Sequence, residues 1–133
     1  MICGRGEDKL AAAVEEIKAY AGKDAKVYSY SADIADADSC AAFVQLMNEQ
    51  HGGVDFLINN AGRSIRRAIE ASYERFHDFE RTMQLNYFGA LRVTMGLLPG
   101  MVAKRKGHIV NISSISVLVN APRFSAYVAS KAA

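Results

Sequence analysis

Apolar residues recur at two spacings along the chain, and each spacing predicts a different kind of element. Leu10, Val14 and Ile17 repeat at the period of one helix face, so a helix is expected here that stops at Gly22. Residues 25–30 instead alternate and are rich in Val and Tyr, which predicts a strand. The N-terminal part of the chain therefore combines a helix with a strand.

Two short apolar runs are Val54–Ile58, which is bounded by glycine and asparagine, and His108–Ile112, which follows Gly107. Runs of this kind predict strands that are buried on both faces of a parallel sheet. A helix that ends near His51 is expected before the first run, and either Asp36 or Asp38 can cap its N-terminus.

A long helix is expected between these two strands, from about Arg81 to Lys104. Its apolar residues go nearly all the way round, which indicates a helix buried on more than one side. Pro99 lies within it, so a kink or a break is expected there. A short helix at 72–79 precedes it, whereas 113–123 is expected to form a loop that leads into a last helix.

Strands that alternate with helices indicate an α/β fold with a parallel sheet. The 133 residues have the size of one domain, in which Met1–Cys3 supplies the end of a first strand. The net charge of +2 is too small to indicate nucleic acid as a partner.

Cys3 and Cys40 are far apart and lack metal-ligand spacing, which is typical of free thiols in a reducing compartment. Asn86 and Arg92 interrupt the longest apolar stretch, so it is not expected to span a membrane. A cytoplasmic protein is therefore expected.

Candidate chemistry gathers where the predicted strands end. Arg5 follows the first strand, Asp33 the second, Asn59–Gly62 the third and Ser114 the fourth. Ligands of open parallel sheets bind beyond these carboxyl ends. Each position also has a simpler interpretation: a turn, a helix cap or an ordinary loop hydroxyl. Asn86, within an apolar helix, is equally compatible with a structural hydrogen bond.

Tyr127 and Lys131 lie four residues apart in the last predicted helix, so their side chains should share one face. An ammonium next to a phenol stabilises the phenolate, which makes the phenol a usable proton donor and acceptor. Ser130, in the same turn, is expected to be neutral for activity.

Four motifs occur together and in order: Asn59-Asn60-Ala61-Gly62, Asn86 in Leu85-Asn86-Tyr87, Ser113-Ser114, and Tyr127 with Lys131. This constellation resembles the short-chain dehydrogenase/reductase family over essentially the whole chain. The stretch Ala121–Tyr127 is also similar to members that act on fatty acyl-CoA or fatty aldehydes.

The resemblance implies a catalytic role for four residues. Tyr127 would exchange a proton with a small carbonyl or alcohol substrate, and Lys131 would assist it and hold the nicotinamide ribose. Ser114 would orient the substrate oxygen in the manner of an oxyanion donor. Asn86 would hold a water in the proton relay.

The resemblance also implies how a nicotinamide cofactor is held. Asp33 and Ile34 would bracket the adenine, and Asn59, Ala61 and Gly62 the adjoining ribose. The family place of an acidic residue that favours NAD(H) is here Gly4, followed by Arg5. Because an arginine there can meet a 2′-phosphate, NADP(H) is expected over NAD(H), which stays possible.

The family's glycine-rich phosphate turn does not occur in this sequence. The expected fold is therefore an incomplete Rossmann-like doubly wound parallel sheet, a partial cofactor-binding domain over residues 1–133. A non-catalytic fragment that only packs against a partner is the alternative to an enzyme. The long helix and the Tyr127 helix are candidates either for the interface of a homo-oligomer or for monomer core.

Overall fold

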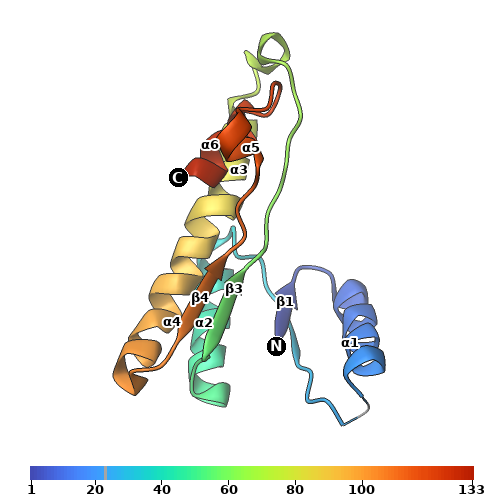
Figure 1. Cartoon of the computed structure of the whole chain (residues 1–133), viewed down its shortest axis with the longest axis vertical. Coiled ribbons are helices and arrows are strands. Elements are labelled where there is room, and N and C mark those ends of the chain that lie inside the picture. The colour runs from blue at the N-terminus through green and yellow to red at the C-terminus, as the bar shows by residue number, and fades with distance from the viewer. Residues whose placement is uncertain (23) are drawn as a thin grey trace. The chain divides into compact units, whose positions relative to one another are not determined.

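The computed structural model describes residues 1–22 and 24–133, in which helices alternate with parallel strands. The α/β class predicted from the sequence is confirmed. The chain divides into two compact units, Met1–Asp33 and Ile34–Ala133, and each is described by itself (Figure 1).

The first unit consists of β1 (Ile2–Gly4), α1 (Glu7–Ala21) and β2 (Ser29–Ser31). The two strands pair in parallel, with Ile2 opposite Ser29. The observed β2 is shorter than the predicted strand at 25–30, because β1 offers only three residues to pair with. The helix stops at Gly22 as predicted. The backbone φ of Gly22 is 98°, a conformation that favours glycine.

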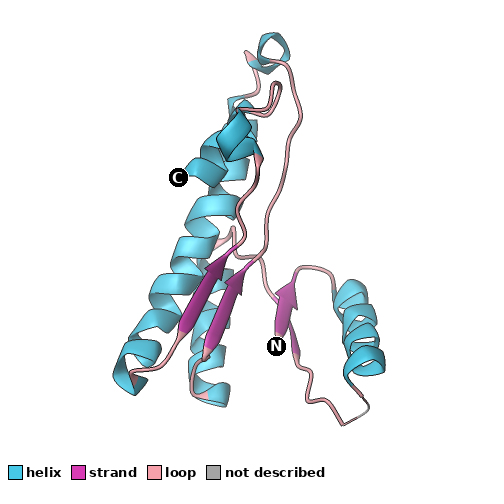
Figure 2. Ribbon diagram, in the orientation of Figure 1, coloured by secondary structure: helices cyan, strands magenta, loops and turns pink. Residues whose placement is uncertain are grey.

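The second unit consists, in chain order, of α2 (Ala37–His51), β3 (Phe56–Asn59), the 3₁₀-helix η1 (Ile69–Ser72), α3 (Phe76–Met83), the π-helix η2 (Gln84–Gly89), α4 (Ala90–Lys104), β4 (His108–Asn111), α5 (Ser116–Val119) and α6 (Ser125–Ala132). Of the two predicted caps, Asp36 is the one used, since its carboxylate accepts the Ser39 N–H at 2.8 Å. The strands β3 and β4 pair in parallel (Figure 2).

Helices cover one face of the β3–β4 pair, so the prediction of strands buried on both faces is wrong for this unit. Asn59 donates from its amide to Thr94 of α4 at 3.0 Å, which places its face of β3 toward that helix. Phe56 and Ile58 alternate with Asn59 along the strand and are 71% and 62% exposed. The apolar residues of the strands alone could not show which face of the sheet is covered by helices.

The long helical segment is continuous from Phe76 to Lys104, so of the two predicted forms at Pro99 the break is wrong, while the kink stays a prediction. Its irregularity lies instead in the π-helical turns of η2. Pro99 is exposed, and the carbonyl that it leaves without a donor belongs to Met95, which is 60% exposed. Water can serve that carbonyl, and the helix therefore continues.

One side of α4 forms the core of the second unit, where the helix packs against α2. Its buried residues are Val93, Leu97 and Met101, which recur every four positions. Val102, by contrast, is 66% exposed. The prediction that this helix is buried on more than one side is wrong for the unit as described.

Two shorter segments also differ from their predicted forms. The expected loop at 113–123 contains the one-turn helix α5, and the expected helix at 72–79 is divided between η1 and α3. The last helix, α6, begins after Pro122 as predicted. In the part of the chain that the structure describes, no helix combines the length and the hydropathy that crossing a membrane requires.

Candidate active site

Tyr127 and Lys131 lie on α6, so the helix that their spacing required is confirmed. The Lys131 ammonium donates to the Ile112 carbonyl at 2.7 Å, just beyond the end of β4. The Tyr127 ring is half-buried and meets the Phe124 ring edge-on at a centroid distance of 6.2 Å. Its hydroxyl has no hydrogen-bond partner among the described residues, so it can bond to a ligand.

Asn86 is 8% exposed and lies in the π-helical turns between α3 and α4. Its Oδ1 accepts the Arg63 N–H at 2.7 Å, while its Nδ2 donates to the Arg63 carbonyl at 2.9 Å and to the Ser130 Oγ at 2.8 Å. One side chain therefore joins the segment after Gly62 to α6. The water that the resemblance implied for Asn86 stays a prediction.

Ser130 belongs to this network, although the sequence predicted it to be neutral. It is 2% exposed, accepts from Asn86 and donates to the Tyr127 carbonyl at 2.8 Å. The expectation that Ser130 is neutral for activity stays a prediction. The available signal was Asn86 itself, since a polar residue in an apolar helix requires a partner.

Gly62 lies between two of the predicted catalytic residues. A Cβ atom at this position would lie 3.5 Å from the Asn86 Oδ1 and 3.5 Å from the Lys131 Nζ. Any larger side chain would therefore fill the space beside the ammonium. Ala61, Asn86 and Lys131 also line one pocket of about 340 Å³ beyond the ends of β3 and β4. These residues fit a ligand that approaches the backbone closely, as the ribose of a nicotinamide cofactor would.

Asn59 uses its polar groups within the protein. Its amide donates to the Asn111 Oδ1 at 2.8 Å as well as to Thr94, and its carbonyl accepts the Ile112 N–H at 3.0 Å. These bonds fasten the ends of β3 and β4 together and to α4. The cofactor contact expected for Asn59 stays a prediction.

Ser114 and Ile34 are placed by local contacts. The Ser114 hydroxyl lies 2.8 Å from the Ser116 hydroxyl and accepts the Ser116 N–H at 3.2 Å, which fixes the turn into α5. Ile34 is 9% exposed, and its carbonyl lies against Gly89. A contact of Ser114 with substrate, and of Ile34 with adenine, therefore stay predictions.

In the first unit, Arg5 and Asp33 lie together beyond the paired ends of β1 and β2. The Arg5 Nη1 is 3.6 Å from the Asp33 Oδ2, and the two side chains are 64% and 37% exposed. The sequence prediction that strand ends collect these residues is in keeping with this geometry. Because the arginine is largely exposed, its remaining donors can reach an anionic ligand.

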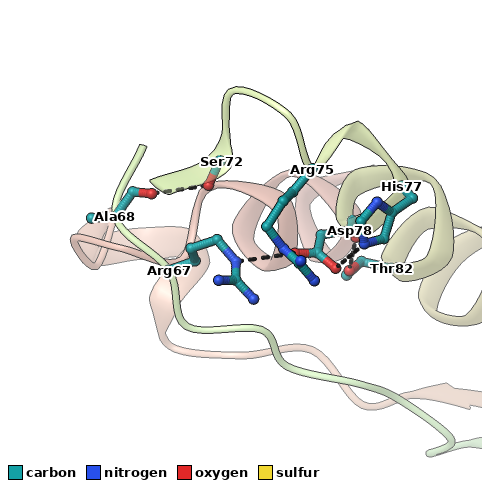
Figure 3. A network of polar contacts seen from close by, with 7 residues as sticks. All are labelled: Arg67, Ala68, Ser72, Arg75, His77, Asp78 and Thr82. Carbon is teal, nitrogen blue, oxygen red and sulfur yellow. Dashed lines mark hydrogen bonds and ion pairs between the residues drawn. The ribbon is translucent and has the colours of Figure 1, made fainter. Parts of the chain in front are cut away.

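A second polar cluster, which the sequence did not indicate, centres on Asp78 at the start of α3 (Figure 3). Its side chain is 6% exposed. The Asp78 Oδ2 accepts hydrogen bonds from the Arg75 Nε at 3.0 Å and from the Arg67 Nε at 3.1 Å, and the His77 Nε2 lies 3.3 Å from the Oδ1. The hydrogen bond from Arg75, aided by the nearby charges, holds the pKa of Asp78 below its usual range against the opposing effect of desolvation.

The fold and the site together define an α/β protein of Rossmann-like type, with a tyrosine and a lysine one helical turn apart close to the end of a parallel strand pair. The family model described as short chain dehydrogenase matches residues 1–133. The chain therefore belongs to the short-chain dehydrogenase/reductase family of oxidoreductases.

Curated relatives include two named as fatty acyl-CoA reductases. The protein from Acinetobacter baylyi is 55% identical over 123 residues, covering 90% of this chain and 41% of its own length. The protein from Mycobacterium tuberculosis is 46% identical over 130 residues, covering 97% of this chain and 43% of its own. This chain thus spans about two fifths of the length of these relatives.

Solved structures of the family have the same fold. L-sorbose reductase from Gluconobacter frateurii, complexed with NADPH and L-sorbose, superposes with a TM-score of 0.87 at 27% identity and covers 98% of this chain and 49% of its own. Xylitol dehydrogenase with bound NAD⁺ gives a TM-score of 0.86 at 25% identity and covers 98% of this chain and 48% of its own. Neighbours thus carry either form of the cofactor.

Proposed function

We propose that this chain provides the catalytic part of an NADP(H)-dependent oxidoreductase that interconverts a carbonyl and an alcohol. The observation that carries the proposal is the Lys131 ammonium, fixed at 2.7 Å on the Ile112 carbonyl one helical turn from Tyr127. In the proposed reaction this fixed ammonium assists the phenol of Tyr127, whose hydroxyl has no hydrogen-bond partner among the described residues.

Tyr127 is proposed as the group that moves the proton. During reduction its hydroxyl donates to the oxygen of the substrate, and during oxidation it accepts that proton back. Ser114 is proposed to donate a hydrogen bond to the same oxygen. The nicotinamide cofactor, when bound, supplies or accepts the hydride.

The chain's own residues support a nicotinamide cofactor. Gly62 leaves the backbone open beside Asn86 and Lys131, and the ammonium has donors beyond the one that Ile112 accepts. Arg5, largely exposed at the end of β1, supports NADP(H) over NAD(H) because a guanidinium binds a phosphate by two parallel bonds. This preference is tested by the ratio of affinities for NADPH and NADH in Arg5→Ala, which should fall toward one.

The proposed substrate is a fatty acyl-CoA or a fatty aldehyde. Support comes from the stretch Ala121–Tyr127 and from the relative of Acinetobacter baylyi, which is named for fatty acyl-CoA and is 55% identical. A homo-oligomer that pairs through α4 is also proposed, since Met95 and Val102 leave apolar surface exposed on that helix. A single monomeric mass in solution at micromolar concentration would overturn this pairing.

The test follows oxidation of NADPH by the protein that carries this chain, with a fatty aldehyde as substrate. Tyr127→Phe should lower kcat by about 10²–10⁴-fold, because it removes the proton that the phenol supplies. Tyr20→Phe is the matched control, since Tyr20 is 97% exposed on α1. Full activity in Tyr127→Phe would refute the proposal.

A further inference from the structure

Asp78 connects three segments that are far apart in the sequence. It lies on α3 and receives the guanidinium of Arg67, which belongs to the connection between β3 and η1. The backbone N–H of Arg67 in turn donates to the Arg123 carbonyl at 2.7 Å, in the loop before α6. A chain of contacts therefore runs from α3 through Arg67 to that loop.

The Asp78 carboxylate, at the centre of this series of contacts, is nearly buried. With a side chain 6% exposed, Asp78 would be costly to ionise without partners, and Arg67 and Arg75 each supply an Nε–H at about 3 Å. Figure 3 shows the Arg67 side chain, from the connection before η1, and the Arg75 side chain, from the start of α3, both directed toward Asp78. Such charge-assisted bonds hold their partners more firmly than bonds between neutral groups do.

The two arginine arms differ in what they connect. Arg75 precedes Asp78 by three residues, so its bond stays within the start of α3. Arg67 lies eleven positions away and carries the contact on to Arg123. Loss of Arg67 should therefore loosen the connection and the loop, whereas loss of Arg75 should not.

These two segments line a pocket at the N-terminal end of α6, the helix that carries the proposed acid/base. A pocket of about 370 Å³ is lined by Arg67, Ile69, Arg123 and Ser125, among others. Ser125 is the first residue of α6, and Tyr127 follows two positions later. The wall that the Asp78 contacts hold in place thus borders the helix that carries the phenol.

We propose that Asp78 is a positioning residue that holds the connection at 67–70 and the loop before α6 in place as one wall of the substrate pocket. The inference rests on the proposed function, because it takes α6 as the helix that meets the substrate. Two other contacts hold α6 itself: Asn86 to Ser130 and Lys131 to Ile112. Loss of the Asp78 contact should therefore impair substrate binding while leaving Tyr127 in place.

The first arm of the test measures hydrogen exchange at the Arg67 amide. Asp78→Asn removes the charge of the carboxylate. Arg67→Gln removes the Arg67 guanidinium but leaves Arg75 and His77 in contact with Asp78, so this second variant decides the test if the first does not fold. Both should raise the exchange rate by about tenfold or more, since a hydrogen bond to a charged group is lost. Arg75→Gln is the control within the cluster and should leave the rate within about twofold.

A second control is Asp55→Asn, which removes an ion pair of similar length elsewhere in the unit. Asp55 binds the Lys106 ammonium at 2.6 Å, and Lys106 lies in the turn before β4, away from the residues of the pocket wall. This variant should leave exchange at Arg67 unchanged.

The second arm measures steady-state kinetics with a fatty aldehyde and saturating NADPH. Asp78→Asn and Arg67→Gln should raise KM by about tenfold and leave kcat within about twofold, because the wall moves and the phenol does not. An unchanged exchange rate at Arg67 overturns the inference, and so does faster exchange with an unchanged KM. If the wild-type protein reduces no aldehyde, the proposed function fails, and the exchange arm alone then decides whether Asp78 holds this segment.

Discussion

Lys131 is bound by a backbone carbonyl and not by a carboxylate. Its 2.7 Å bond to Ile112 fixes the side chain, and no acidic residue forms an ion pair with it in the described part of the chain. A carbonyl dipole orients an ammonium without cancelling its charge, whereas a carboxylate would oppose it. The ammonium therefore keeps donors for the roles proposed for it, beside Tyr127 and toward a bound ribose.

Ser130 is predicted to matter for stability. Ser130→Ala removes the acceptor of the Asn86 Nδ2 and the donor to the Tyr127 carbonyl, in a position that is 2% exposed. Unfolding in urea should show a loss of about 1–3 kcal/mol, since buried polar groups lose partners. The exposed Ser64→Ala is the control and should change stability by less than about 0.5 kcal/mol. Equal unfolding midpoints for wild type and Ser130→Ala would contradict the network.

Asp78 is predicted to make stability depend on pH in the acid range. Its pKa is lowered in the folded state, first by the hydrogen bond from Arg75, so it protonates at a lower pH there than in the unfolded chain. The stabilisation is complete above the unfolded value of about 3.9 and is lost as pH falls through the folded value. Arg67 and Arg75 stay charged throughout, and His77 adds a third cation when protonated.

The measurement compares urea unfolding of wild type and Asp78→Asn between neutral pH and acid. The gap between the two free energies of unfolding should narrow as pH falls below about 4. Asp55, whose pKa the hydrogen bond from Lys106 also lowers, is present in both proteins and cancels from the gap. A gap that persists unchanged in acid would show that the carboxylate charge contributes nothing.

Among the elements, the π-helix η2 has the most direct effect on the site. It spans Gln84–Gly89, directly before α4, and contains Asn86. A π-helical turn contains more residues than an α-helical turn, so it rotates the following residues around the helix axis. Asn86 can therefore face Arg63 and Ser130, while α4 turns its buried residues toward the core. Helical periodicity alone cannot predict such an offset.

Gly89 is predicted to be required where this π-helix ends. A Cβ there would lie 2.7 Å from the Ile34 carbonyl oxygen, and backbone cannot move aside as a flexible side chain can. Gly89→Ala should therefore destabilise the fold by about 1–3 kcal/mol. Gly100→Ala, in the same helical segment with nothing within 4 Å, should instead stabilise it by about 0.5–1 kcal/mol. Chemical denaturation of the two variants side by side tests this, and a shift in the same direction for both would contradict it.

Element types could be predicted from the sequence, but which faces they bury could not. The helix periods, an aspartate cap at either Asp36 or Asp38, the stop at Gly22 and the helix that carries Tyr127 all follow from local chemistry, and the structure has each of them, with Asp36 as the cap. The break at Pro99 and the doubly buried strands were wrong, because both depend on what packs against each face. Tertiary contacts of that kind leave no trace in a local pattern.

For the molecule as a whole, motif order predicted which residues gather but not how they are joined. Gly62, Asn86 and Lys131 come together as the motifs indicated. The side chain of Asn59 and the cluster around Asp78 were not foreseen in their observed roles, since each depends on partners more than ten positions away. The spacing of Tyr127 and Lys131 along one helix could be read from the sequence, whereas contacts between different elements depend on the three-dimensional fold.

The two units are predicted to differ sharply in local stability. The first has 33 residues, a three-residue ladder and a helix in which Leu10 is buried while Tyr20 is 97% exposed. Units below about 40 residues rarely bury enough surface to hold their fold alone. The second unit buries Met47 and Leu97, which are 1% and 2% exposed, between α2 and α4.

Hydrogen exchange of the 133-residue chain measures this difference directly. Amides of α1 should exchange through local opening that costs little, whereas those of α4 should exchange only through unfolding of the second unit, at least about 10³-fold more slowly relative to a free peptide. The comparison is internal, because α1 and α4 are each 15 residues long and are measured in one sample. Equal protection in the two helices would mean that Met1–Asp33 draws stability from contacts beyond its own ladder and helix, and the prediction would then be wrong.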